Sequence, residues 1–371
     1  MSMGEDSHGS QKIHVHSVKF NVIMNVFLMT SQFLYPLITI PYVSRVLSVE
    51  HNGAISFAQY TAQVFSVFCV LGIPVYGIRE CSRVRDSPSL LAKTVKELLV
   101  IISVCTVATL SVYLLCIFTV QRFTEEKPLL LIFSLSVILS GFGVEWFFQA
   151  IEQYAYITVR SLVFKVIGLV ALFAMVHSDS DYMGYAVTIV MATALPNVIN
   201  VVKLLRTIQW KSSGSLNIRR HIVPVLVFFM TNLATTIYLS ADLVILGFVT
   251  MGNFQVGLYQ LATKIKAFSA QAVNAAGLVM IPRLSYYLVH GNKKSYYRLL
   301  TKNLSFSLIS GLGLMSFIIL FAEKIIMVIA GANFLASAPA LKIIAPALVM
   351  IGISNICGFD ILTPNKQEKY M

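Results

Sequence analysis

Long apolar stretches alternate with short polar connections along the whole chain of 371 residues. A membrane-spanning helix needs about 20 mostly apolar residues, because each helical residue rises ~1.5 Å and the hydrocarbon layer is ~30 Å thick. We expect ten such helices, near residues 18–45, 54–78, 97–120, 128–148, 160–177, 182–202, 222–247, 256–281, 304–322 and 337–360. The pattern therefore predicts an all-α polytopic membrane protein with about ten transmembrane helices.

The lysines and arginines fall in every second connection between these helices. Twenty of the 28 lie on one side, namely Lys12, Lys19, Arg79, Arg83, Arg85, Lys93, Lys96, Arg160, Lys203, Arg206, Lys211, Arg219, Arg220, Arg283, Lys293, Lys294, Arg298, Lys302, Lys366 and Lys369. The connections on the other side contain only Arg122, Lys127 and Lys324. By the positive-inside rule, this distribution predicts that the amino terminus and the last residue are both cytoplasmic.

Composition argues against a soluble enzyme. Hydrophobic residues make up 57% of the chain and charged residues 12%, whereas soluble domains have about 25% charged residues. The net charge of +12 does not predict a nucleic-acid partner, because the basic residues share one membrane face, where they meet anionic lipid headgroups. The five cysteines lack ligand spacing, and His14 and His16 have no third ligand nearby. We therefore expect no metal and no cofactor.

Two parts of the chain resemble each other at an offset near 204 residues. The run GAISFAQY from Gly53 is similar to GLYQLA from Gly257. Further on, GIPVYGIRECS from Gly72 is similar to GLVMIPRLS from Gly277. Many transporters consist of two such halves, with the substrate site between them near the middle of the membrane.

The repeat predicts two pseudo-repeated bundles. We expect a cytoplasmic tail (1–17), a first six-helix bundle (18–203), a basic cytoplasmic linker (204–220) and a second bundle of four helices (221–371). Since the second bundle has fewer helices than the first, we expect it to be one hairpin short, as in a truncated twelve-helix protein. A natural ten-helix protein is the alternative.

Polar side chains form stripes on four of the expected helices. The stripes are Asn21, Asn25, Gln32, Tyr35 and Thr39; Ser56, Gln59, Gln63 and Ser66; Asn232, Thr235, Thr236 and Asp242; and Gln260, Lys264, Gln271 and Asn274. Polar groups at membrane depth are costly, and they face either a cavity or a partner helix. The stripes predict a water-filled cavity between the two halves, with hydrogen bonding between helices as the alternative.

Charged residues inside the expected helices are mostly basic. Lys264 lies ~12 Å into its helix, where it either faces a cavity or pairs with Asp242. Asp242 could instead carry a proton or a sodium ion in coupled transport. Glu145 and Lys165 fall at similar depth on consecutive helices, so we expect a structural ion pair between them.

Three runs of residues carry a resemblance to a known family. PLITIPYVSRVL from Pro36, GIPVYGIRE from Gly72 and GFGVEWFFQAIEQYAYITVRS from Gly141 resemble bacterial polysaccharide flippases, the polysaccharide transporter family of the MOP (multidrug, oligosaccharidyl-lipid, polysaccharide) exporter superfamily. Such proteins move an undecaprenyl-diphosphate-linked oligosaccharide, the repeat unit of O-antigen, capsule or exopolysaccharide, from the cytoplasmic to the outer leaflet. The resemblance implies a MATE-like architecture of twelve or fourteen helices in two bundles, located in the bacterial cytoplasmic (inner) membrane.

The resemblance also implies a cationic central cavity, alternating access and coupling to a proton or sodium gradient. Lys264, Arg79 and Arg45 are the candidates to meet the diphosphate by charge-assisted hydrogen bonds, although Arg79 and Arg45 could simply anchor helix ends. Candidates to bind sugar hydroxyls are Asn25, Gln32, Gln63, Gln271 and Asn274. The expected partners are the lipid-linked oligosaccharide, membrane lipids and other polysaccharide assembly proteins.

Two other functions fit a polytopic chain. An ion-coupled multidrug exporter of the same superfamily would share the architecture, but a cavity for organic cations favours acids and aromatic residues over bases. A membrane-bound polysaccharide polymerase or ligase would need a converging catalytic set. The sequence contains no paired carboxylates suited to catalysis, no nucleophile elbow and no metal cluster, so we expect no enzyme activity.

Overall fold

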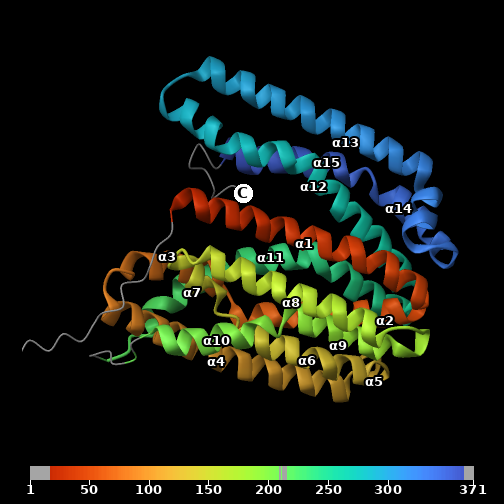
Figure 1. Cartoon of the computed structure of the whole chain (residues 1–371), viewed down its shortest axis with the longest axis horizontal. Coiled ribbons are helices and arrows are strands. Elements are labelled where there is room, and N and C mark those ends of the chain that lie inside the picture. The colour runs from red at the N-terminus through yellow and green to blue at the C-terminus, as the bar shows by residue number, and fades with distance from the viewer. Residues whose placement is uncertain (1–16, 209, 211–214, 363–371) are drawn as a thin grey trace, which may run out of the picture. The chain divides into compact units, whose positions relative to one another are not determined.

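The computed structural model describes residues 17–208, 210 and 215–362, and these fold into helices without a strand among them (Figure 1). The all-α class predicted from the hydrophobic pattern is confirmed. The predicted tail 1–17, apart from Ser17, lies outside the described residues, as do Lys211, Lys366 and Lys369.

The helices in chain order are α1 (Val18–Val46), α2 (Val49–Val70), α3 (Ile73–Val84), α4 (Pro88–Thr119), α5 (Gln121–Glu125), α6 (Lys127–Gly141), α7 (Glu145–Ala150), α8 (Tyr154–Met175), α9 (Tyr182–Thr193), α10 (Pro196–Thr207), α11 (Arg219–Thr250), α12 (Phe254–Val289), α13 (Lys293–Ala330), α14 (Ala338–Ile344) and α15 (Ala347–Asn355). Short 3₁₀ helices lie at Asp179–Asp181 and Ala332–Ser337, and a π-helix, Ile356–Leu362, follows α15.

Four of the predicted helices are each broken in two. The segment 54–78 divides into α2 and α3, and the segment 182–202 into α9 and α10. A proline lies in the first turn of both α3 and α10, where its missing N–H costs nothing but where it cannot continue the helix before it. The segment 128–148 divides into α6 and α7, and the segment 337–360 into α14 and α15.

Among the described residues, eight helical segments are long and apolar enough to cross a membrane. The pair α14 and α15, bent by 47°, would make a ninth. The helix α12, which covers the predicted segment 256–281, does not pass this test; its 36 residues nevertheless extend ~54 Å. The chain is thus a multi-pass membrane protein, and the tenth crossing stays a prediction.

The chain divides into two compact units. Of the described residues, the first contains 17–35, 58–176, 183–208, 210 and 215–242, and the second contains 36–57, 177–182 and 243–362. The division falls inside α1, α2 and α11, each of which continues from one unit into the other, and directly after the first residue of α9. The predicted bundle boundaries stay predictions.

The core of the first unit gathers around α3, α4 and α7. Trp146, Phe147 and Phe148 on α7 are buried there. Gly77 on α3 lies against the Trp146 ring so closely that a Cβ at Gly77 would be 2.7 Å from a ring carbon. Small residues let helices approach each other in this way within membranes.

The second unit has its own core, formed by α12, α13, α14 and α15, with α12 and α13 side by side in Figure 1. Its fully buried side chains include Leu261, Ile318, Ile326, Phe334 and Leu341. α13 ends at Gly331, whose φ of 85° lies in the left-handed region that glycine adopts without steric cost.

Candidate functional site

The run of residues 141–161, which carried the family resemblance, folds into a tight structure at the start of α8. It contains the end of α6, the short helix α7 and the first turns of α8. The chain reverses after α7 at Glu152, whose φ is 58°. Arg85 Nη1 donates to Glu152 Oε1 at 2.5 Å, and this bond raises the pKa of the Arg85 guanidinium. The reversal places Glu145 beside Arg160.

Glu145 and Arg160 form an ion pair. Arg160 Nη2 donates to Glu145 Oε2 at 2.5 Å, and Gln149 Nε2 donates to Glu145 Oε1 at 3.3 Å. The Arg160 side chain is only 6% exposed. Among the described residues, no acceptor lies at its buried Nε and Nη1 atoms. One edge of the guanidinium is therefore fixed by Glu145, while two of its buried nitrogen atoms have no acceptor among the described residues.

A second cation, Lys203, comes to the same place from α10. Its Nζ lies 3.3 Å from the centroid of the Tyr156 ring, and the guanidinium carbon of Arg160 lies 5.8 Å from the same centroid. The Tyr156 hydroxyl donates to Asn200 Oδ1 at 3.0 Å. An aromatic face attracts cations, so Tyr156 holds two positive side chains near each other.

Lys165 lies farther along α8 and contacts α1. Its Nζ donates to Ser31 Oγ at 2.8 Å, and about two turns earlier Thr158 donates to the Met24 carbonyl at 2.8 Å. Glu145 binds Arg160 in this structure, and the expected ion pair between Glu145 and Lys165 stays a prediction. Helix α8 begins six residues before Arg160, so this arginine lies within the helix rather than in a loop. Arg160 is therefore the residue whose side chain binds the Glu145 carboxylate.

These side chains give the first unit a cationic cluster, which we define as Glu145, Tyr156, Arg160, Lys165 and Lys203. Three positive charges face one negative charge. Arg160 and Lys165 lie ~9 Å and ~17 Å along α8 from its first residue. Uncompensated charge at such depth is costly, and in membrane proteins it marks a path for ions or charged substrates. Arginine and lysine bind phosphate oxygens by charge-assisted hydrogen bonds.

The other predicted site residues are distributed over both units. Gln32, Gln63 and Gln271 are exposed, and Asn25, Asn274 and Lys264 are half-buried. Asn25, Gln32 and Gln63 belong to the first unit, and the other three to the second. That they line one common cavity stays a prediction.

Two of the predicted cations have structural contacts. Arg45 Nη2 donates to the Val328 carbonyl at 2.7 Å, in the last turn of α13, where a cation also interacts favourably with the helix dipole. The guanidinium carbon of Arg79 lies 5.5 Å and 5.3 Å from the ring centroids of Tyr76 and Phe228. These contacts fit the anchoring alternative, and the substrate-binding role of both residues stays a prediction.

Asp242 is half-buried on α11 and is the last residue of the first unit. Its role in ion coupling stays a prediction. One residue of the polar stripe on α11 makes a hydrogen bond to another part of the first unit, as expected if the stripes join helices: Asn232 Nδ2 donates to the Leu71 carbonyl at 3.0 Å.

A second buried network lies in the first unit, where α3, α4 and α11 meet. The Glu97 carboxylate is fully buried and accepts hydrogen bonds from the Asn217 backbone at 2.7 Å and from Arg220 Nη2 at 2.6 Å. His221 Nε2 lies 2.8 Å from Glu97 Oε2, and His221 Nδ1 lies 2.7 Å from the Tyr76 hydroxyl. Both oxygens of this carboxylate have hydrogen-bond partners, so we interpret the network as a structural link between these helices.

Comparison with known proteins agrees with the architecture. Residues 18–288 match the family described as polysaccharide biosynthesis protein. The chain belongs to this family. A protein of Escherichia coli (strain K12) named "Putative O-antigen transporter" is 24% identical over 363 residues, which cover 95% of this chain and 85% of that protein. A Shigella dysenteriae protein of the same name is 23% identical over 274 residues, covering 72% and 67%. No solved structure matches the chain.

The family match includes every residue of the cationic cluster, but sequence reasoning assigned Arg160 and Lys203 only to basic connections. Two signals could have found Arg160. Arg160 follows Tyr156 by four residues, which places both on one helix face, and both lie in the run that carried the resemblance. Lys203 had no local signal, because its place depends on how α10 packs against α8.

Proposed function

We propose that this polysaccharide biosynthesis protein is a flippase. It translocates undecaprenyl-diphosphate-linked oligosaccharide repeat units from the cytoplasmic to the outer leaflet, for the synthesis of a surface polysaccharide. The names of its relatives support transport of an O-antigen substrate. The observation that carries the proposal is the cationic cluster, in which three cations and one carboxylate lie together inside a membrane-spanning unit.

The chemistry of the cluster suits a diphosphate. A sugar headgroup cannot cross hydrocarbon unaided, because its hydroxyls and phosphates would lose their water. The free nitrogen atoms of Arg160 and the ammonium of Lys203 supply donors for phosphate oxygens. Lys165 lies ~7.5 Å deeper along α8 and continues the positive path, while the lipid tail stays in the bilayer.

The division of the chain supports alternating access. It falls between Tyr35 and Pro36 in α1, and a proline inside a helix removes a backbone hydrogen bond and permits bending. In α11 it falls directly after Asp242. Protonation of Asp242, or binding of sodium there, would change the charge at a place where the two units join along one helix, and this is our hypothesis for coupling to an ion gradient.

Two rival functions make different demands on the site. A multidrug exporter that carries organic cations would be opposed by the net positive charge of the cluster. A polymerase or ligase would need a catalytic set open to the sugar, but the one carboxylate of the cluster is bound to Arg160 and Gln149.

The test is transfer between leaflets in liposomes that contain the purified chain. One sample holds a fluorescent undecaprenyl-diphosphate oligosaccharide and a parallel sample holds a lipophilic cationic dye. We expect transfer of the sugar lipid and not of the dye. Transfer of the dye alone would establish the drug exporter, and transfer of neither would overturn the proposal for this chain.

A further inference from the structure

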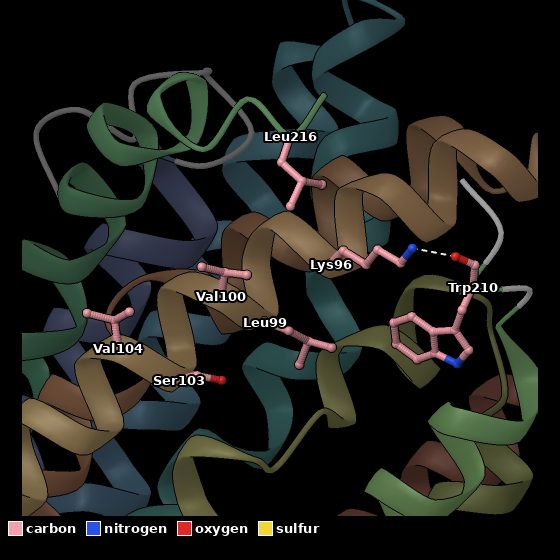
Figure 2. Close-up of a pocket in the computed structure, with 7 residues that line it drawn as sticks. All are labelled: Lys96, Leu99, Val100, Ser103, Val104, Trp210 and Leu216. Carbon is pink, nitrogen blue, oxygen red and sulfur yellow. Dashed lines mark hydrogen bonds between the residues drawn. The ribbon is translucent and has the colours of Figure 1, made fainter. Parts of the chain in front are cut away.

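A groove runs along the outside of α4 in the first unit, and none of the residues that line it belongs to the cationic cluster. Two adjoining hollows of about 380 Å³ and about 320 Å³ share Val100 and Val104 in their walls. The first also contacts Lys96, Trp210 and Leu216 (Figure 2). The second continues over apolar side chains of α4, of α11 and of the residue before α11, namely Ile101, Cys105, Ile218, Ile222, Val225 and Leu226. Together they form one groove with a polar end and an apolar remainder.

Lys96 and Trp210 form the polar end of the groove. Figure 2 shows the Lys96 side chain extended toward the Trp210 backbone, whose carbonyl accepts a hydrogen bond from its Nζ. The ammonium lies 5.9 Å from the indole centroid, and the indole Nε1 donates to the Leu205 carbonyl at 2.9 Å. Lysine and tryptophan are the residues that membrane proteins place at the level of lipid headgroups.

The polarity of α4 changes along one face. Lys93 and Lys96 are followed by Val100 and Val104 at helical spacing, so they lie on the same side of the helix. From Lys96 to Val104 this face extends ~12 Å. A positive end followed by an apolar run matches a molecule that has an anionic head and a hydrocarbon chain.

The buried Glu97 network holds the opposite wall in place. Glu97 is adjacent to Lys96 but points inward, where it binds the Asn217 backbone and Arg220. The bound segment carries Leu216 and Ile218, both of which line the groove. The wall that carries Leu216 and Ile218 is thus held by the fully buried Glu97 carboxylate, which binds the half-exposed Arg220 and the Asn217 backbone.

We propose that this groove binds one acidic phospholipid. Its phosphate lies at Lys96 and one acyl chain lies along Val100 and Val104. The site is separate from the cationic cluster proposed for the translocated substrate. It lies near the start of α4, on the side that the basic residues predict to be cytoplasmic, where anionic headgroups meet the positively charged connections.

The two tryptophans of the chain allow a direct test. Trp146 is buried in the core of the first unit, whereas Trp210 lines the groove. The full chain is reconstituted with phospholipids brominated on the acyl chain, which quench indole fluorescence at short range. The signal of Trp210 is the difference between the unaltered protein and Trp210→Phe. We expect brominated phosphatidylglycerol to reach half-maximal quenching of Trp210 at a several-fold lower mole fraction than brominated phosphatidylcholine.

Replacement of Lys96 should remove this preference. In Lys96→Gln the two lipids should quench Trp210 equally, whereas Lys302→Gln, which removes an exposed basic residue from the same predicted side, should keep the preference. Should Lys96→Gln not fold, Val100→Phe fills the shared part of the groove and should also weaken quenching by phosphatidylglycerol. Equal quenching by both lipids in the unaltered protein would overturn the proposal. So would an equal loss in Lys302→Gln, or displacement of phosphatidylglycerol by undecaprenyl phosphate at low mole fraction.

Discussion

Gly53 and Gly257 contact each other reciprocally in the second unit. A Cβ on Gly53 would lie 1.8 Å from the Asn253 carbonyl oxygen, and a Cβ on Gly257 would lie 2.1 Å from the Val49 carbonyl oxygen. Each oxygen belongs to the residue four positions before the other glycine, and both pairs are separated by 204 residues. This is the offset of the internal repeat, so the start of α2 and the start of α12 cross as equivalent elements around a local two-fold axis.

The crossing predicts that either glycine is sensitive to the smallest side chain. Gly53→Ala and Gly257→Ala each place a methyl group against backbone that cannot move aside, and overpacking of this kind costs at least ~1–3 kcal/mol. We expect both variants to lower the midpoint of thermal unfolding in detergent, to a similar extent.

Gly313→Ala is the matched control in the same unit. It lies on α13 with nothing within 4 Å of its Cβ position, and alanine favours a helix over glycine by ~0.8–1 kcal/mol. Its midpoint should stay equal or rise. A midpoint unchanged in Gly53→Ala would mean that the two helices are farther apart than in this structure.

The cationic cluster predicts that Lys203 on α10 is needed for transport and that its neighbour Arg206 is not. Lys203 lies over Tyr156, whereas Arg206, three residues later, is exposed. Since a hydrogen bond to a charged group contributes ~1.5–3 kcal/mol, Lys203→Gln should lower the initial rate of sugar-lipid transfer roughly tenfold or more. Arg206→Gln should transfer at nearly the unaltered rate. Equal rates in both variants, at equal protein content, would remove Lys203 from the substrate path.

The partner of Glu145 can be measured by double-mutant cycles. Glu145→Gln combined with Arg160→Gln should show a coupling of ~0.5–3 kcal/mol in thermal or denaturant unfolding, because the two side chains touch. Glu145→Gln combined with Lys165→Gln should be additive within ~0.5 kcal/mol. A larger coupling for Lys165 than for Arg160 would favour the pairing predicted from the sequence.

The difference between these two pairings shows what the sequence could predict. The apolar stretches located nearly every helix, because spanning length and hydropathy are local properties. A charged residue breaks the apolar window, so the predicted helix began at Arg160 itself, whereas α8 begins at Tyr154. That shift of six residues changed the partner of Glu145. Hydrophobicity shows where a helix lies in the membrane, but it does not show where the helix begins.

The groove on α4 could not be predicted from the sequence, for a different reason. Lys96 and Glu97 were adjacent charges at the edge of a predicted helix, without a sign that one turns inward and the other outward. Their separation depends on the approach of α11, which brings Arg220 and His221 to Glu97. Such a contact joins residues more than 120 positions apart, and no periodicity in the chain reports it.

The Glu97 network predicts that the single substitution Glu97→Gln, which removes one charge and keeps the shape, strongly lowers the stability of the protein. Glu97→Gln keeps the shape but leaves the half-exposed Arg220 and the buried His221 without their carboxylate, and leaving buried polar groups without their charged partner costs about 1–3 kcal/mol or more. The control is Glu323→Gln, since Glu323 is 68% exposed and pairs with the half-exposed Lys342 at 3.2 Å, an exposed pair whose loss costs at most ~1 kcal/mol. We expect Glu97→Gln to lower the unfolding midpoint far more than Glu323→Gln. Because Asn217 loses its charged acceptor, Trp210 fluorescence should also change in Glu97→Gln; an unchanged midpoint and spectrum would show that the carboxylate does not hold the start of α11 against α4.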